Sequence, residues 1–262
     1  MLSSLKGFKS SFYLAKQLAK RDVKAQYRQS VLGVLWAIIP VLINAFVWIL
    51  LQSSGAVKLT ATAVPYPLFV LVGTTIWAIF GESLTMSITT VNANKNIITK
   101  INFEKEALIT LGFIKLVFNL LIKFGLIIVF MLYFQVMPTA SFLYFIPLLL
   151  LTMLFFVSVG ILITPLGVLY GDISRLIPIA LQFLMYVTPV LYVMPKEGFL
   201  KIIMHYNPLT YFITDLRSTL TGLPVEHWSF WIITFIATLF LALLAMVVYR
   251  VSMPILTERM SS

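Results

Sequence analysis

The chain of 262 residues contains no cysteine, which excludes disulfide bonds and thiolate ligands for a metal. It has two histidines, His205 and His227, which leave little room for a metal centre. Sequence motifs for a phosphate-binding loop, a serine nucleophile elbow or a zinc protease are absent. We therefore expect no catalytic residues, no metal site and no cofactor in this chain, and no binding of ATP by a P-loop.

Charged residues are also scarce, at 11% of the chain, whereas 60% of the residues are hydrophobic. A water-soluble domain carries about 25% charged residues and about 45–50% apolar ones. A chain of this size could not bury so much apolar surface away from water, so its solvent must be lipid. The net charge of +10 fits basic residues beside membrane segments better than a nucleic-acid surface. The polar first 30 residues do not resemble a cleavable signal peptide.

The apolar runs predict an all-α integral membrane protein with six transmembrane helices. A spanning helix needs about 20 mostly apolar residues. Such runs occupy 31–52, 66–91, 108–136, 142–170, 176–194 and 229–250. We expect one domain over 1–262: an interface helix in 1–30, a six-span bundle in 31–250 and a cytoplasmic tail in 251–262.

Lysine and arginine set the expected orientation. They concentrate before the first span, after the second and in the tail, and few lie in the alternate loops. The positive-inside rule then places both termini in the cytoplasm. Before the first span, apolar side chains recur every three to four residues, as in an amphipathic helix at the headgroup layer: Phe8, Phe12, Ala15, Ala19, Val23 and Tyr27. This helix is either a plain anchor or also borders a partner protein.

The second cytoplasmic loop reads NANKNIITKINFEKEAL from Asn92 onward. Asn94 or Asn96 is suited to cap a short helix that carries Ile97, Ile98 and Ile101. Exposed isoleucines in a polar loop would form a docking surface. The alternative is a tight loop that packs on its own bundle.

The segment 195–228 is too apolar for a free loop and too interrupted for a span. Asn207-Pro208 is a typical helix start, and Thr221-Gly222 is a typical helix end. We expect two short re-entrant helices, at about 196–206 and 208–221, between spans five and six. Such helices are tolerated in a membrane only against protein or a water-filled cavity, which hints at a pathway. The alternative is an amphipathic lid on the outer surface.

Three ionisable residues are expected inside the membrane: Glu82, Lys115 and Lys123. Charges at such depth are costly and are usually paired or face water. Counting 1.5 Å per residue from the cytoplasmic helix ends puts Lys115 nearer than Lys123 to the depth of Glu82. We therefore predict a structural Glu82–Lys115 pair, with Lys123 snorkelling outward or facing a cavity. A proton relay is less favoured, because no chain of carboxylates and histidines continues from Glu82.

Aromatic residues make up 14% of the chain. Interfacial belts would explain most of them, and aromatic faces that stack on sugar rings would explain others. The candidates for a glycan channel or gate are Trp36, Trp77, Phe80, Tyr186, Tyr192, Tyr206 and Tyr211.

The sequence resembles the permease subunit of type-2 ATP-binding-cassette exporters, in the branch that exports O-antigen, capsule and teichoic acid. The residues that carry the resemblance fall in four blocks: Arg21-Asp22 through Gly33, Trp36 and Pro40; Lys100-Ile101-Asn102-Phe103; Gly171-Asp172 through Gln182 and Thr188-Pro189-Val190; and Asn207-Pro208 through Arg217 and Gly222.

This resemblance implies a channel-forming homodimer in the bacterial cytoplasmic (inner) membrane, which exports a lipid-linked polysaccharide. Two copies of a separate ATPase subunit would bind ATP and Mg and drive the export. The resemblance also implies outer-gate helices in 195–222 and contact with the ATPase through Arg21, Arg28, Asn96, Ile97, Ile98, Lys100, Ile101 and Phe103. Other partners are membrane lipid and the glycan, and no nucleic acid. The alternatives are a type-2 exporter of a drug or small lipid, or an integral-membrane enzyme of lipid-linked sugar metabolism.

Overall fold

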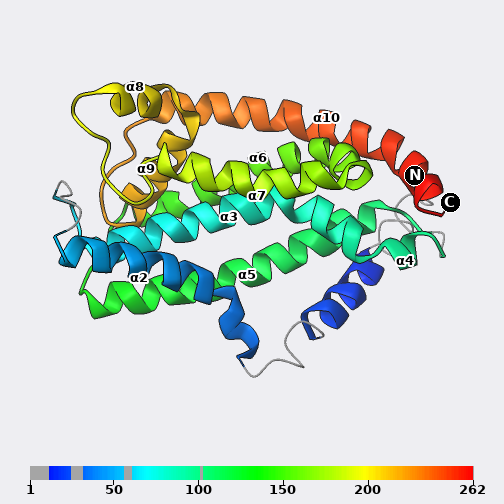
Figure 1. The fold of residues 1–262 in the computed structure, drawn as a ribbon, viewed down its shortest axis with the longest axis horizontal. Helices are drawn as coiled ribbons and strands as arrows, with labels where there is room; N and C mark the ends of the chain where they lie inside the picture. The colour runs from blue at the N-terminus through cyan, green and yellow to red at the C-terminus, as the bar shows by residue number, and fades with distance from the viewer. Residues whose placement is uncertain (1–11, 25–31, 56–60, 101–102, 262) are drawn as a thin grey trace.

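The computed structural model describes residues 12–24, 32–55, 61–100 and 103–261, and these are helical with no strand among them. Residues 12–24 form a helix, the dark blue helix in Figure 1. It lies within the segment predicted to rest at the membrane interface, and we call it the interfacial helix. The further elements are a 3-10 helix η1 (Gly33–Ala37), α2 (Ile39–Ser53), α3 (Tyr66–Ala93), α4 (Lys95–Ile98), α5 (Glu106–Tyr133), α6 (Phe142–Leu169), α7 (Gly171–Tyr186), α8 (Phe199–Tyr206), α9 (Pro208–Leu220) and α10 (Trp228–Ser261). The all-α prediction is confirmed.

Long helices run side by side along the molecule, with α4 and the C-terminus at one end and α8 at the other (Figure 1). We call these the α4 end and the α8 end. Helix α3 lies at the centre, where it packs against α2, α5, α6, α7 and α9. Helix α10 packs mainly on α6. Most residues of α3 are therefore buried, from Tyr66 to Val91.

Four helices are long and apolar enough to cross a membrane, namely α3, α5, α6 and residues Trp228–Met260 of α10. Together with the apolar composition they make the chain a multi-pass membrane protein. Helices α2 and α7 have 15 and 16 residues. At 1.5 Å per residue each is about 22–24 Å long, less than the roughly 30 Å of a hydrocarbon core. The structure therefore does not confirm the count of six spans.

Local backbone features explain the two short helices. The run 31–52 does not form one helix, because Gly33 has φ +48° and the 3-10 helix η1 precedes α2. Helix α7 begins earlier than the predicted 176 and ends at Tyr186, where the chain leaves helical geometry before Pro189. Helix α10 continues without interruption to Ser261, so residues 251–261 of the predicted cytoplasmic tail belong to this helix.

Close backbone contact joins α3 to α6. A Cβ built on Gly160 would lie 2.1 Å from the carbonyl oxygen of Leu84, so only glycine fits at this crossing. Small residues that let helix backbones approach are typical of membrane helix interfaces. Phe80 of α3 stacks on Phe156 of α6 with ring centroids 4.7 Å apart, and Phe212 of α9 meets both rings. This aromatic cluster fixes α9 against the two central helices.

Candidate functional site

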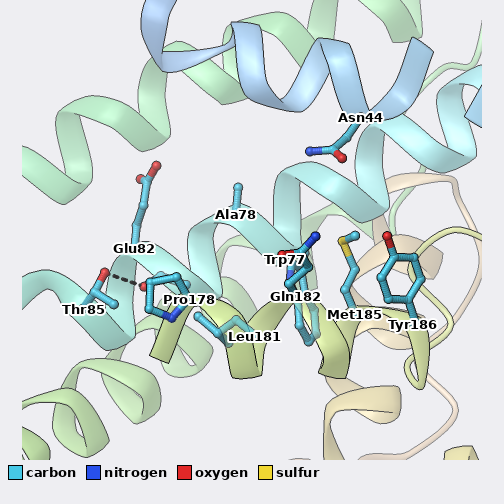
Figure 2. A pocket seen from close by; sticks show the side chains of 11 residues that line it. Asn44, Trp77, Ala78, Glu82, Thr85, Pro178, Leu181, Gln182, Met185 and Tyr186 are labelled. Atoms are coloured by element: carbon cyan, nitrogen blue, oxygen red, sulfur yellow. Dashed lines mark hydrogen bonds between the residues drawn. The ribbon is translucent and has the colours of Figure 1, made fainter. Parts of the chain in front are cut away.

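An open pocket of about 380 Å³ lies between α2, α3 and α7. Its walls combine two aromatic rings with polar side chains, as Figure 2 shows: Asn44, Trp77, Glu82, Gln182 and Tyr186. Apolar side chains of α7 complete the wall, namely Pro178, Leu181 and Met185. The pocket has the mixture of flat apolar faces and hydrogen-bonding groups that a sugar ring requires.

The charged pair beside this pocket differs from the predicted one. The Nζ of Lys123 donates a hydrogen bond to Oε1 of Glu82. Lys123 is buried, with 1% of its side chain exposed, whereas Glu82 keeps 36% exposed at the pocket wall. The predicted Glu82–Lys115 pair and the predicted exposure of Lys123 are both wrong.

Lys115 instead faces the interfacial helix. Its Nζ lies 3.6 Å from Oδ2 of Asp22, and Asp22 also forms an ion pair of 2.7 Å with Arg21. Arg21 donates a further hydrogen bond of 3.0 Å to the side-chain oxygen of Asn94, the residue that precedes α4. The interfacial helix is thereby joined to both α5 and the loop that carries α4.

This arrangement also explains why Asn94 does not act as a side-chain cap. Asn94 occupies the N-cap position of α4, but its amide donates to the carbonyl of Thr90 and its oxygen accepts from Arg21. On the interfacial helix, Ala15 and Ala19 of the predicted apolar face are buried against the protein, whereas Phe12 of the same face and Lys16 are exposed. Phe8 and Tyr27 lie outside the described residues.

The loop around α4 is partly a packing element. Ile98 is buried and Ile97 packs on the core from a half-buried position, so the expectation of exposed isoleucines is wrong for Ile98. Asn96 and Lys100 are exposed, and Phe103 is half-buried. Ile101 and Arg28, two further predicted docking residues, lie outside the described residues.

Two contacts secure the base of this loop. Lys105 donates to the carbonyl of Ile98 and lies 4.5 Å from the ring centroid of Phe103, and burial lowers its pKa. The hydroxyl of Tyr249 on α10 donates to the carbonyl of Lys105 at 3.1 Å. These contacts hold the backbone on which the exposed residues of the loop are carried.

The predicted channel aromatics do not gather in one place. Trp77 and Tyr186 line the pocket between α2, α3 and α7. Phe80 lies in the aromatic cluster with 1% of its surface exposed, so it faces no pocket. The other four do not line this pocket. Trp36 is exposed on η1, Tyr206 is exposed on α8 and Tyr211 lies on α9, whereas the hydroxyl of Tyr192, after α7, donates to the carbonyl of Tyr186.

The model of the ABC-2 type transporter family matches residues 13–221. The chain belongs to the ABC-2 type transporter family. The matched region runs from the interfacial helix to the end of α9 and so contains the pocket, the charged pair and α4. Over 210 residues, 79% of each chain, it is 28% identical to the O-antigen export system permease protein RfbA of Klebsiella pneumoniae. Over 204 residues, 77% of each chain, it is 23% identical to the protein of that name from Myxococcus xanthus.

In this ABC-2 transporter, sequence reasoning missed the polar contacts at the α8 end. Asp215 is buried on α9 and accepts hydrogen bonds from the backbone of His227 and from Nε1 of Trp231, at 3.3 and 2.8 Å. Arg217 is also buried and donates to two backbone carbonyls of the segment after α7. The available signal was the presence of two charged residues, Asp215 and Arg217, in a short helix expected inside the membrane, because such residues need partners there.

Proposed function

We propose that this chain is the membrane subunit of an exporter that moves a lipid-linked polysaccharide across the bacterial cytoplasmic membrane. The observation that carries the proposal is the similarity, over more than three quarters of both chains, to permeases named for O-antigen export. The transported chain would pass the pocket of Trp77 and Tyr186, where flat rings tolerate different sugars and polar groups bind hydroxyls.

The proposed assembly is a homodimer with two separate ATPase subunits that bind ATP and Mg. The pocket is open, and the neighbouring surfaces of α2 and α7 carry exposed apolar side chains, including Val47 and Phe183. A second copy would cover these surfaces and close the pocket into a channel. In this assembly α2 and α7 act as the first and fifth spans, which gives the six-span layout.

The basic residues support an orientation with the α4 end in the cytoplasm. Lys95, Lys100 and Arg250 lie at that end, as does Arg21 of the interfacial helix. The exposed residues Asn96 and Lys100 would then contact the ATPase, with Arg21 alongside. Helices α8 and α9 would lie at the outer side of the membrane.

The test is co-expression of the chain with its ATPase in cells that make the lipid-linked glycan. We expect the two proteins to co-purify, and surface glycan to depend on both. Trp77→Ala is expected to lower export while ATP hydrolysis continues. The control is Trp228→Ala, which removes an indole that contacts Tyr144, away from the pocket. Because Trp77 is 7% exposed and Trp228 is 46% exposed, export is compared at equal amounts of inserted, folded protein. If no ATPase co-purifies, or if both variants lower export equally, the proposal is wrong.

Coupling has its own test in a charge reversal. In Lys100→Glu, at the α4 end, we expect ATP hydrolysis to continue while export falls. The control is Lys196→Glu, which replaces another exposed lysine before α8 and should leave both activities unchanged. Membrane insertion of both variants is checked by protease protection. Normal export in Lys100→Glu would place the ATPase contact elsewhere.

A further inference from the structure

The chain leaves helical geometry after α7, and side chains from other helices satisfy its backbone there. Residues 188–191 are buried. Asn207 donates to the carbonyl of Val187 at 3.2 Å, and the hydroxyl of Tyr66 donates to that of Leu191 at 3.0 Å. Nη2 of Arg217 donates to the two carbonyls between them, of Pro189 and Val190, at 3.0 and 2.7 Å. Unsatisfied carbonyls in a membrane are costly, so these donors hold the break in this shape.

Arg217 is the central donor of this break. Its guanidinium lies 3.6 Å from the ring centroid of Phe69 on α3, and no carboxylate in the described part of the chain forms an ion pair with it. A Cβ on Gly73 would lie 2.3 Å from both Nη2 of Arg217 and the carbonyl oxygen of Val190. A buried cation that loses its acceptors is strongly disfavoured. Arg217 therefore binds α9, the break and α3 into one unit.

The opposite side of α9 is fixed to α10. Asp215 is 1% exposed and accepts from three donors of the α10 start, including Nδ1 of His227 at 2.9 Å. Phe212, three residues earlier, lies in the aromatic cluster of α3 and α6. Moving α9 as a body would break the hydrogen bonds of Asp215 on one side and the carbonyl contacts of Arg217 on the other.

Helix α8 is much less buried than α9, and the hydrogen bond that the hydroxyl of Tyr211 donates to the carbonyl of His205 joins it to α9. Met204 is the one buried residue of α8, while Phe199 and Tyr206 are 77% and 80% exposed. Gly198 precedes it with φ +94°, a conformation that glycine adopts without strain. Asn207 follows it in an extended conformation. Helix α8 is thus flanked by two non-helical residues and packs on little besides α9.

We propose that α9 is a fixed part of the protomer, that Arg217 is the positioning residue that holds it there, and that α8 alone moves when the outer side opens. This rests on the proposed export function, which requires an outer opening. The outer gate that the family resemblance implies in 195–222 would then contain one moving helix, α8, which turns about Gly198 and Asn207.

A disulfide supplies the first test, and the natural chain has no cysteine to interfere. A Cβ on Gly222, just beyond α9, would lie 3.7 Å from Cβ of Thr139 in the α5–α6 turn. That separation lies in the disulfide range of about 3.5–4.5 Å. Gly222 has φ +88°, so its replacement strains the backbone in both redox forms, and the test is the comparison between the two forms. In the double variant Thr139→Cys, Gly222→Cys, we expect the same export rate in oxidised and reduced protein. Loss of export on oxidation, restored by reduction, would overturn the proposal.

Single cysteines supply the second test. Tyr206→Cys on α8 and Ser218→Cys on α9 are labelled with a membrane-impermeant maleimide, with the ATPase either free or trapped with ATP. We expect the labelling rate at Tyr206→Cys to change on trapping and the rate at Ser218→Cys to stay constant. An equal change at both sites would show that the two helices move together and would refute the proposal.

Variants of Arg217 test its role as a positioning residue. We expect Arg217→Ala, combined with Ser218→Cys, to raise maleimide labelling of α9, and Arg217→Lys to restore part of the protection because it keeps a donor and the charge. Unchanged labelling in inserted Arg217→Ala protein would contradict the proposal. If Arg217→Ala does not insert, Arg217→Lys and the disulfide decide. Failure of the export function itself is seen separately, as no glycan export by the cysteine-free parent.

Discussion

The ion pair of Glu82 and Lys123 gives the sharpest prediction about stability. The variant Glu82→Gln leaves the buried ammonium of Lys123 without its carboxylate. Breaking a buried pair by removing one partner costs about 3–5 kcal/mol. Because 36% of the Glu82 side chain is exposed at an open pocket, water screens the pair on that side, and we expect the lower value. A loss of about 3 kcal/mol corresponds to roughly a 150-fold change in the ratio of folded to unfolded protein.

The assay is a double-mutant cycle on purified protein in detergent, with unfolding followed by heat or denaturant. Lys123→Met is expected to cost less than Glu82→Gln, because it leaves a carboxylate that reaches pocket water. The double variant should recover most of the loss. The control cycle combines Glu82→Gln with Lys115→Met, and its two effects should add, since Lys115 pairs with Asp22. If the Glu82 and Lys123 effects also add within about 0.5 kcal/mol, the pair is not coupled and the reasoning fails.

Three further predictions concern packing and the base of the α4 loop. Gly160→Ala should lower the free energy of unfolding, measured by thermal unfolding, by about 1–3 kcal/mol or more, because the added Cβ would overlap the carbonyl of Leu84. The control is Gly125→Ala, whose Cβ would meet no neighbouring atom within 4 Å and which should be tolerated. Tyr249→Phe should lower stability by about 1 kcal/mol, measured the same way, through loss of its hydrogen bond to the carbonyl of Lys105. Burial lowers the pKa of Lys105 below 10.5, so near that pH the unfolded chain binds more protons than the folded chain. The free energy of unfolding should therefore rise as the pH approaches 10.5. Lys105→Met should remove that rise, which is measured as unfolding temperature over a pH series.

Local sequence signals predicted the α8 end well. Asn207 caps α9 through its side-chain oxygen, which accepts from the backbone of Leu209, and Pro208 begins the helix. The helix ends at Leu220, before Gly222 with φ +88°. These features depend on backbone geometry within a few residues, so a sequence contains them directly.

The pairing of Glu82 was wrong for a reason that depth counting ignores. Side chains on a helix lean toward its N-terminus. Helix α3 starts at the α8 end and α5 at the α4 end, so Glu82 leans toward the α8 end while lysines on α5 lean the opposite way (Figure 1). Lys123 therefore leans toward Glu82, and Lys115 leans away from it, toward Asp22. Tertiary packing sets the rotation of each helix and the position of the interfacial helix, and a local sequence pattern predicts neither.

The short helices show a second limit of sequence reasoning. Hydropathy made 31–52 a continuous span, but the positive φ of Gly33 and the 3-10 turn that follows shorten the helix to α2. Hydropathy measures how apolar a segment is and not whether its backbone is continuous. The sequence indicated that Arg217 needs partners but could not identify them, because its acceptors are backbone carbonyls, which every residue has.

The central position of α3 has a consequence for how such a transporter changes over evolutionary time. Substitutions along α3 meet neighbours on nearly every side, as Gly73 and Gly81 illustrate through the atoms that crowd them. The pocket walls on α2 and α7 are free of that constraint, since Asn44, Gln182 and Tyr186 are exposed. Under the proposed function, a lineage could therefore acquire a new substrate through substitutions in those two short helices while the other helices stay nearly constant.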